Sequence, residues 1–178
     1  ACGKLNLEFA GQKLRAMITE DRNWLARAES AIACGMLKDA NAMASMRKLV
    51  TSDPAEKTQL AMMDALASFS EDAQMSVPLI VKHLESSQWQ LRVGAAQALG
   101  KIGSMEAVEP LITRMEQETG RCREEIRDAL KAITYDDLGM KPENWRKWGD
   151  REKANTPNGL PKRPDKPKEA KTPKADPN

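Results

Sequence analysis

Histidine and cysteine are scarce in this chain of 178 residues, and their scarcity limits the chemistry open to it. His83 is the single histidine, so no Ser/His/Asp or Cys/His arrangement for nucleophilic catalysis can be defended. The three cysteines, Cys2, Cys34 and Cys122, show no Cys-x-x-Cys spacing, which argues against a zinc site or a disulfide framework. No glycine-rich phosphate loop is present either. The sequence therefore predicts a protein that is not an enzyme and that holds no cofactor or metal.

Long apolar runs are also absent, since no stretch approaches the roughly 18 residues that a membrane span needs. The chain has no intact signal peptide and does not begin with Met, so we expect a processed product or a fragment. Its opening residues, Ala-Cys-Gly, fit two interpretations. They resemble the end of a bacterial lipoprotein signal, which would place a lipid on Cys2. They also return, as "ACGML", at residues 33–37, which favours a repeated helix end instead.

Aromatic residues make up only 4% of the chain, and β-branched runs with strict alternation are missing. Ala, Leu, Met, Lys, Glu and Arg dominate, and because these are good helix formers we expect an all-α protein. The net charge of +2 is unevenly spread: residues 151–178 hold eight basic and four acidic residues, so the rest is about −2. Nucleic-acid-binding domains usually carry a basic face, so this charge argues against nucleic acid as a partner.

Internal repetition is the most informative signal in the sequence. A shift of 32 lays residues 1–19 over 33–51 with seven identities, and the pattern small-large-x-x-large then continues in steps of 32, 33 and 31. Because the first copy falls on residues 1–5, we expect these to end a helix whose start is missing. The copies are Ala1-Cys2-Leu5, Ala33-Cys34-Leu37, Ala65-Leu66-Phe69, Ala98-Leu99-Ile102 and Ala129-Leu130-Ile133.

Apolar residues at i, i+3 and i+4 predict a pair of helices in each unit. Asp53 is expected to cap the helix that follows it, with Pro54 at its first position, and Gly103 to end a later helix. Such a pair cannot bury its apolar face alone, so we expect the units to stack. The first helices are predicted at 6–18, 39–50, 75–85 and 106–117, and the second helices at 22–37, 55–69, 88–103 and 121–134.

Residues 77–103, "VPLIVKHLESSQWQLRVGAAQALGKIG", resemble a HEAT repeat of the bacterial type also called PBS-lyase-like, and residues 108–134 are a weaker copy. The resemblance implies a short α-solenoid of about four helical hairpins over residues 1–135. Solenoids of this kind offer extended curved surfaces, which suggests a non-catalytic scaffold that binds a protein partner through its second helices. The alternatives are a nucleic-acid-binding protein similar to the HEAT-like DNA glycosylases and a subunit similar to a bilin lyase.

Residues 135–148, "YDDLGMKPENWRKW", resemble a segment that ends many bacterial HEAT-repeat proteins. We expect a turn at Gly139 and a helix from Pro142 that places Trp145 and Trp148 on one face, so that residues 136–150 cap the last unit. Residues 151–178 are rich in Lys and Pro and predict a disordered tail. The tail is either a solvated extension or a basic segment for an acidic partner or an anionic surface. The resemblance implies a bacterial protein of the cytoplasm or the cell envelope.

Candidate partner-binding residues follow from the expected turns and second helices. Arg27, Arg92 and Arg123 fall in one column, in which the second unit has Gln59. HEAT-like repeats commonly pair this column with an acidic group, so a structural ladder is the alternative to partner contact. A tryptophan beside the column either packs or lies exposed, and we expect His83 to be structural. The full set of candidates is Gln59, Trp89, Gln90, Arg92, Arg123 and Glu124.

Overall fold

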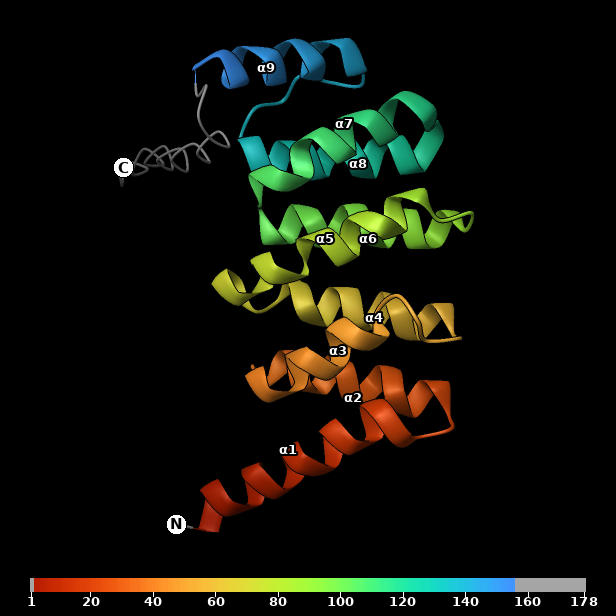
Figure 1. The fold of residues 1–178 in the computed structure, drawn as a ribbon, viewed down its shortest axis with the longest axis vertical. Helices are drawn as coiled ribbons and strands as arrows, with labels where there is room; N and C mark the ends of the chain where they lie inside the picture. Colours follow the sequence, from red (N-terminus) through yellow and green to blue (C-terminus); the bar gives the residue numbers. More distant parts are fainter. Residues whose placement is uncertain (1, 156–178) are drawn as a thin grey trace, which may run out of the picture.

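Pairs of helices stack one on another from α1 and α2 at one end to α7 and α8 near the other, with α9 beyond them (Figure 1). The structure, a computed structural model, describes residues 2–155 and the side chains of residues 8–69 and 72–155. No strand occurs within residues 2–155, so the predicted all-α fold is confirmed there. The elements are α1 (Cys2–Glu20), α2 (Trp24–Met36), η1 (Ala40–Ala42), α3 (Met43–Leu49), α4 (Glu56–Ala67), η2 (Ser70–Ser76), α5 (Val77–Val81), η3 (Lys82–Glu85), α6 (Trp89–Ile102), η4 (Met105–Ala107), α7 (Val108–Gln117), α8 (Gly120–Thr134) and α9 (Pro142–Asn155).

The second helices of the four pairs, α2, α4, α6 and α8, pack on one another in chain order and form one column of the stack. The first helices α1, α3, α5 and α7 each pack on the second helix of their own pair and form the other column. Several first helices begin or end in 3-10 turns, as η1, η3 and η4 show. The stack is therefore the predicted α-solenoid of four hairpins.

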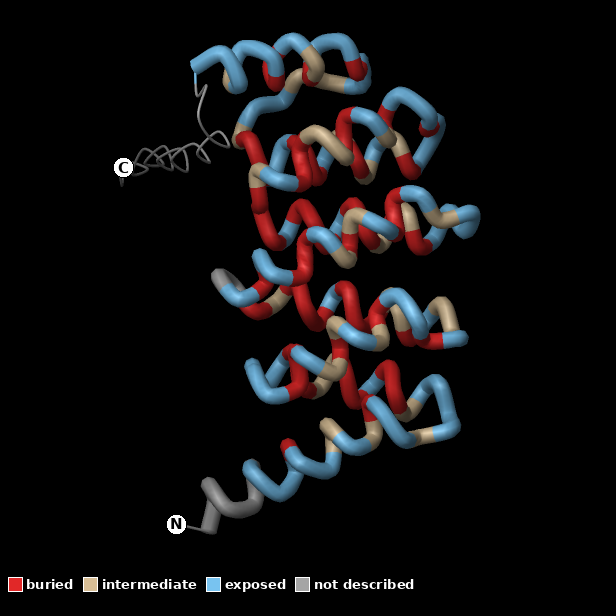
Figure 2. Tube along the Cα trace, viewed as in Figure 1, coloured by how far each residue is buried: buried red, intermediate tan, exposed pale blue. Residues whose placement is uncertain are grey.

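The repeated small-large pattern forms the centre of the core. Cys34, Leu66, Leu99 and Leu130, which occupy equivalent positions in the four second helices, are all fully buried. Buried residues run through the middle of the whole stack, between the two columns of helices (Figure 2). The 31- to 33-residue period thus records contacts between successive units, because each unit covers the apolar face of the one before it.

The structure corrects the prediction for the first residues of the chain. No helix ends after Leu5: α1 is continuous from Cys2 to Glu20. The segment from Lys4 to Lys13 contains no proline, and a single glycine costs a helix only about 1 kcal/mol, so nothing in it enforces a break. The sequence match between residues 1–5 and 33–37 therefore does not correspond to two equivalent helix ends.

Two further boundaries differ from those predicted. The residue that caps α4 is Ala55 rather than Asp53, whose carboxylate accepts a hydrogen bond from the Ala55 N–H and is turned toward the preceding unit. The predicted tail begins too early, because α9 continues through residues 151–155, which include good helix formers and whose Lys153 donates to Glu109 on α7. Residues 156–178 of that tail lie outside the described part of the chain.

Close contacts between second helices depend on small residues. A Cβ atom added to Gly35 of α2 would lie 3.0 Å from the Cα of Ala65 in α4, and one added to Gly100 of α6 would lie 2.9 Å from the Cα of Ala129 in α8. These separations are shorter than an ordinary carbon–carbon contact. Glycine is therefore required at these positions for the helices to approach as they do.

The far end of the second-helix column is polar. The position equivalent to Gly35 and Gly100 in α8 is Lys131, whose ammonium donates to the carboxylate of Asp137 at 3.0 Å. The predicted turn at Gly139 is confirmed, with φ of 75°, and α9 begins at Pro142 as expected. Trp145 and Trp148 are buried, and α9 packs on α7. That this segment caps the array stays a prediction, which their burial favours.

Candidate functional site

An arginine near the start of a second helix ties neighbouring units together at two places. In α2, the Arg27 guanidinium donates to the backbone oxygens of Asp21 and Arg22 at 2.9 and 3.2 Å, and to the carboxylate of Asp53 at 2.7 and 2.8 Å. Burial alone would raise the pKa of Asp53, but the hydrogen bonds and charge of Arg27, together with hydrogen bonds from the Ala55 N–H and Thr58, outweigh it and hold that pKa below its usual value. The pair joins the turn before α2 to the turn before α4.

The same arrangement recurs at Arg92, which donates to the backbone oxygens of Ser86 and Ser87 at 2.9 and 3.1 Å and pairs with the carboxylate of Glu118. The offsets along the chain are identical to those around Arg27: six and five residues back to the carbonyls, and 26 residues forward to the carboxylate. Both members of the Glu118 pair are largely buried. Arg92, a candidate for partner contact, is thus placed in the structural ladder.

Gln59 occupies the arginine position of the second unit and makes a neutral version of the same contacts. Its amide donates to the backbone oxygen of Asp53, six residues back, at 2.6 Å. Its carbonyl oxygen lies 3.0 Å from Nε2 of the buried His83, in place of a carboxylate. Burial lowers the pKa of His83, which keeps the ring neutral at physiological pH. The His83 ring is therefore held by contacts within the protein, and Gln59 is turned toward it.

Arg123 ends the ladder without its carboxylate. The residue 26 positions on is Gly149, in α9, which has no side chain to accept a hydrogen bond. The Nε of Arg123 is buried and has no hydrogen-bond partner within the described structure. The absence of an acidic residue at that offset is visible in the sequence, so this difference between Arg123 and the other column members could have been foreseen.

The remaining candidates lie on the surface at the starts of second helices. Trp89 is 47% exposed at the first position of α6, with the exposed Gln90 beside it. Trp24, at the same place in α2, is 38% exposed, and the ammonium of Lys57 lies 5.0 Å from the centre of its ring. Glu124 is exposed on α8. The structure does not gather these residues around one cavity.

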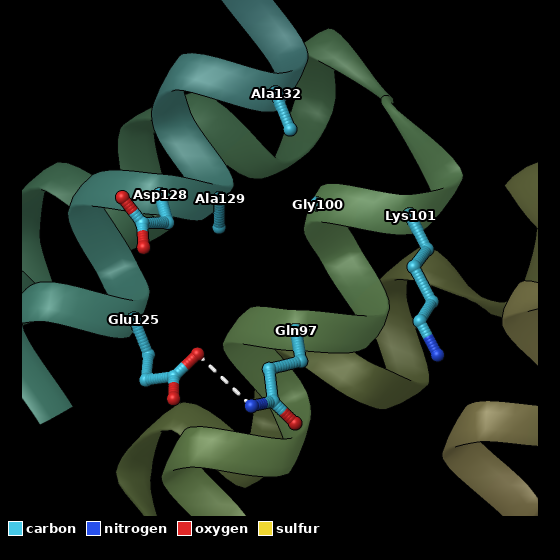
Figure 3. A pocket seen from close by; sticks show the side chains of 7 residues that line it. All are labelled: Gln97, Gly100, Lys101, Glu125, Asp128, Ala129 and Ala132. Atoms are coloured by element: carbon cyan, nitrogen blue, oxygen red, sulfur yellow. Dashed lines mark hydrogen bonds between the residues drawn. The ribbon is translucent and has the colours of Figure 1, made fainter. Parts of the chain in front are cut away.

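A shallow hollow of about 500 Å³ lies between α6 and α8, where Gly100 packs on Ala129. Figure 3 shows the amide of Gln97 on α6 reaching across it to the carboxylate of Glu125 on α8, which it meets at 2.9 Å. We call this cavity the α6/α8 hollow. Its lining residues are Gln97, Gly100, Lys101, Glu125, Asp128, Ala129 and Ala132.

A second hollow, of about 330 Å³, lies between α2 and α4 where Gly35 packs on Ala65, and we call it the α2/α4 hollow. It is built from the same positions of the repeat: Ile32 corresponds to Gln97, and Met36 to Lys101. The glycine that draws each pair of helices together also leaves the space above it unfilled. Its lining residues are Ile32, Gly35, Met36, Lys38, Asp64, Ala65 and Ser68.

The two hollows open on one surface, formed by α2, α4, α6 and α8, which we call the second-helix face. Between them an ion pair joins Lys101 of α6 to Asp64 of α4. None of the residues that line the hollows was among the partner-binding candidates predicted from the sequence. The sequence feature that could have indicated these lining residues is the recurrence of glycine at positions 35 and 100, where two second helices come closest.

The described residues contain no cluster of His, Cys, Asp or Glu that could hold a metal ion. Within the same part of the chain, no helix is both long enough and apolar enough to cross a membrane. What the second-helix face offers is shape, with both polar and apolar side chains, rather than a reactive group. Such a surface can bind another molecule but shows no arrangement for chemistry on it.

Comparison with known proteins agrees with this geometry. A family of HEAT repeats matches residues 48–131, from α3 to α8. No protein with a curated description matches the chain. The matched segment covers the middle of the stack, including the Gly100 contact and the complete Arg92 network. Residues 48–131 are therefore similar to HEAT repeats.

Proposed function

We propose that the chain is a non-catalytic scaffold that binds a protein partner along its second-helix face. The observation that carries the proposal is the pair of hollows, built from equivalent positions two units apart on one continuous surface. Helical repeat arrays use extended surfaces of this kind for interaction. Exposed apolar side chains stand on or beside this face, including Met36, which is 80% exposed.

Nucleic acid is disfavoured by the charges of the same face. Carboxylates lie among its cations, since Asp64 contacts Lys101 and Glu125 contacts Arg121. These carboxylates repel a phosphate backbone, whereas a surface that binds nucleic acid is basic, because counterion release by Lys and Arg supplies most of the affinity. No observation in the structure favours a role like that of a DNA glycosylase or a bilin lyase. The PBS-lyase-like subtype stays a prediction from residues 77–103.

Capture from a lysate of the source organism tests the proposal with two matched pairs of substitutions. Met36→Lys with Ala132→Trp alters both hollows at exposed positions. Met75→Lys with Ala44→Trp makes the same changes at exposed positions of η2 and α3, in the first-helix column. Each immobilised full-length protein is treated with nuclease and washed at high salt.

A protein partner on the second-helix face should be retained by the unaltered chain and by the first-column control, and lost from the variant with altered hollows. Retention by all three proteins would refute the assignment of the face. Loss from all three on nuclease or salt treatment would instead point to nucleic acid or to a charged contact outside this face.

A further inference from the structure

The two hollows share their geometry but differ in the chemistry of their walls. In the α2/α4 hollow, the residues from α2 are Ile32 and Met36, both apolar. At the equivalent positions of the α6/α8 hollow stand Gln97 and Lys101, both polar. The facing helix adds Asp64 to the first hollow, and Glu125 and Asp128 to the second. The difference is therefore one of polarity and charge.

One ion pair increases this difference in charge between the two hollows. Lys101 lies at the edge of the α6/α8 hollow, but its side chain runs away from Glu125 and Asp128, as Figure 3 shows, to pair with Asp64. The pair neutralises the single carboxylate that lines the α2/α4 hollow. It also draws the single cation that lines the α6/α8 hollow toward the neighbouring groove. The first hollow keeps its apolar wall of Ile32 and Met36, with the Lys38 ammonium at its edge held by the backbone oxygen of Ser68, and the second is left with two carboxylates.

The arginines that reach these two carboxylates leave them open to another cation. Arg121 approaches Glu125 at 3.5 Å from a side chain that is largely exposed, which is a weak contact in water. Arg127 contacts Asp128 at 2.8 Å, but it also pairs with Asp137 beyond the end of α8. The other neighbour of Glu125 is the neutral amide of Gln97. Glu125 and Asp128 are three residues apart on one face of α8, so an arriving Lys or Arg side chain can approach both carboxylates.

The separation of the hollows sets the spacing of what fills them. Packed helices lie about 8–10 Å apart, and two such steps, from the α2/α4 groove to the α6/α8 groove, make about 16–20 Å. An extended chain advances about 3.3 Å per residue, so about five or six residues bridge this distance. A helical ligand would need about twice as many, since it rises about 1.5 Å per residue.

We propose that the partner presents an extended segment that places a large aliphatic side chain in the α2/α4 hollow and a Lys or Arg side chain in the α6/α8 hollow, about six residues apart. This inference rests on the proposed function and adds the chemistry that the second-helix face recognises. The aliphatic group covers Ile32 and Met36, and the cation binds Glu125 and Asp128.

Synthetic peptides test the proposal on the full-length chain by NMR. Each peptide has a Ser, Ala and Pro background and carries one Leu and one Arg, separated by two, six or ten residues in either order. Backbone amide signals of Gly35 and Ala65 report on the first hollow, and those of Gly100 and Ala129 on the second. Peptides that carry Leu alone or Arg alone are the single-anchor controls.

Leu alone should shift only the Gly35 and Ala65 signals, and Arg alone only those of Gly100 and Ala129. With a six-residue separation, one of the two orders should shift both pairs and bind about tenfold more tightly than with a two-residue separation. Glu125→Gln with Asp128→Asn should remove the response to Arg and leave that to Leu. Met36→Lys should do the opposite, and Met75→Lys should change neither.

Equal affinity at all separations, or an Arg response that survives the Glu125→Gln and Asp128→Asn changes, would overturn this inference. The lysate experiment separates its failure from failure of the proposed function. If the captured partner is lost from the hollow variant while no peptide shows the expected spacing, the face binds a protein by other chemistry. If the partner is retained by that variant, both proposals fall.

Discussion

Replacement of Gly100 by alanine tests the close approach of α6 and α8 that underlies the α6/α8 hollow. The added Cβ would lie 2.9 Å from the Cα of Ala129 and 3.2 Å from its Cβ. Because the first of these atoms belongs to the backbone, the clash is relieved only if the two helices move apart. Overpacking of this kind costs about 1–3 kcal/mol, whereas alanine in place of glycine gains about 1 kcal/mol of helix propensity. We expect a net loss of up to about 2 kcal/mol in the free energy of unfolding.

Gly11→Ala is the matched control, because it makes the same chemical change inside α1. There the added Cβ would approach Arg15 Nη1 and Asp39 Oδ2, both at 3.2 Å, and these are the ends of flexible side chains. The two groups can shift by a few tenths of an ångström, so the helix propensity should dominate. We expect this variant to be as stable as the unaltered chain or up to about 1 kcal/mol more stable.

Urea unfolding followed by circular dichroism measures both variants, with midpoints compared because a repeat array need not unfold in two states. Adding Ala129→Gly to the Gly100→Ala chain removes the second of the two clashing atoms, so the pair should lose less stability than the sum of the single changes. If Gly100→Ala is as stabilising as Gly11→Ala, the helices are not held together at this position as described.

Three further changes test the ladder, the core and the end of the array. Asp53→Asn should cost about 3 kcal/mol at pH 7 in urea unfolding, because it leaves the buried Arg27 without its counterion. Since the folded pKa of Asp53 is depressed, the pair stabilises the protein above the unfolded pKa of about 3.9 and less as the pH falls below it. The variant should therefore lose less stability than the unaltered chain between pH 5 and pH 2, and an equal loss would contradict the ladder. Burial raises the pKa of the Cys34 thiol to about 11, so brief alkylation at pH 8 should modify it, by mass spectrometry, only after unfolding. Trp145→Ala should cost about 3–5 kcal/mol and speed amide exchange in α9, and unchanged exchange there would show that the helix is not anchored by this ring.

Much of the fold could be predicted because the sequence repeats with the same period at which successive units pack on one another. The pattern around Leu66 and Leu99 placed all four second helices within about two residues, since the same apolar positions are buried in each unit. The first helix was misjudged because sequence similarity between residues 1–5 and 33–37 carries no information on whether a turn follows. Asp53 was assigned to the helix after it, yet its carboxylate is bound by an arginine 26 residues earlier.

The candidate site was harder to predict because it depends on pairs of residues far apart in the chain. Arginine is common at binding surfaces, and only the contact with Glu118, on the next unit, shows that the Arg92 side chain is already paired within the protein. The hollows arise where Gly100 meets Ala129, and their chemistry depends on the direction taken by Lys101. A single sequence gives the positions of these residues on their helices but not which of them meet.

Lys131 has a consequence for anyone who wishes to lengthen this array by design. Grafting a further hairpin after α8 would bring a new helix against the position that Gly35, Ala67 and Gly100 occupy in earlier units, where every side chain is small or absent. The lysine side chain would be trapped in that contact and would lose Asp137, so the added module would be rejected. Extension would need Lys131→Gly or Lys131→Ala together with removal of the segment that carries Asp137. Copies of the middle units should therefore be easier to insert within the array than to append after α8.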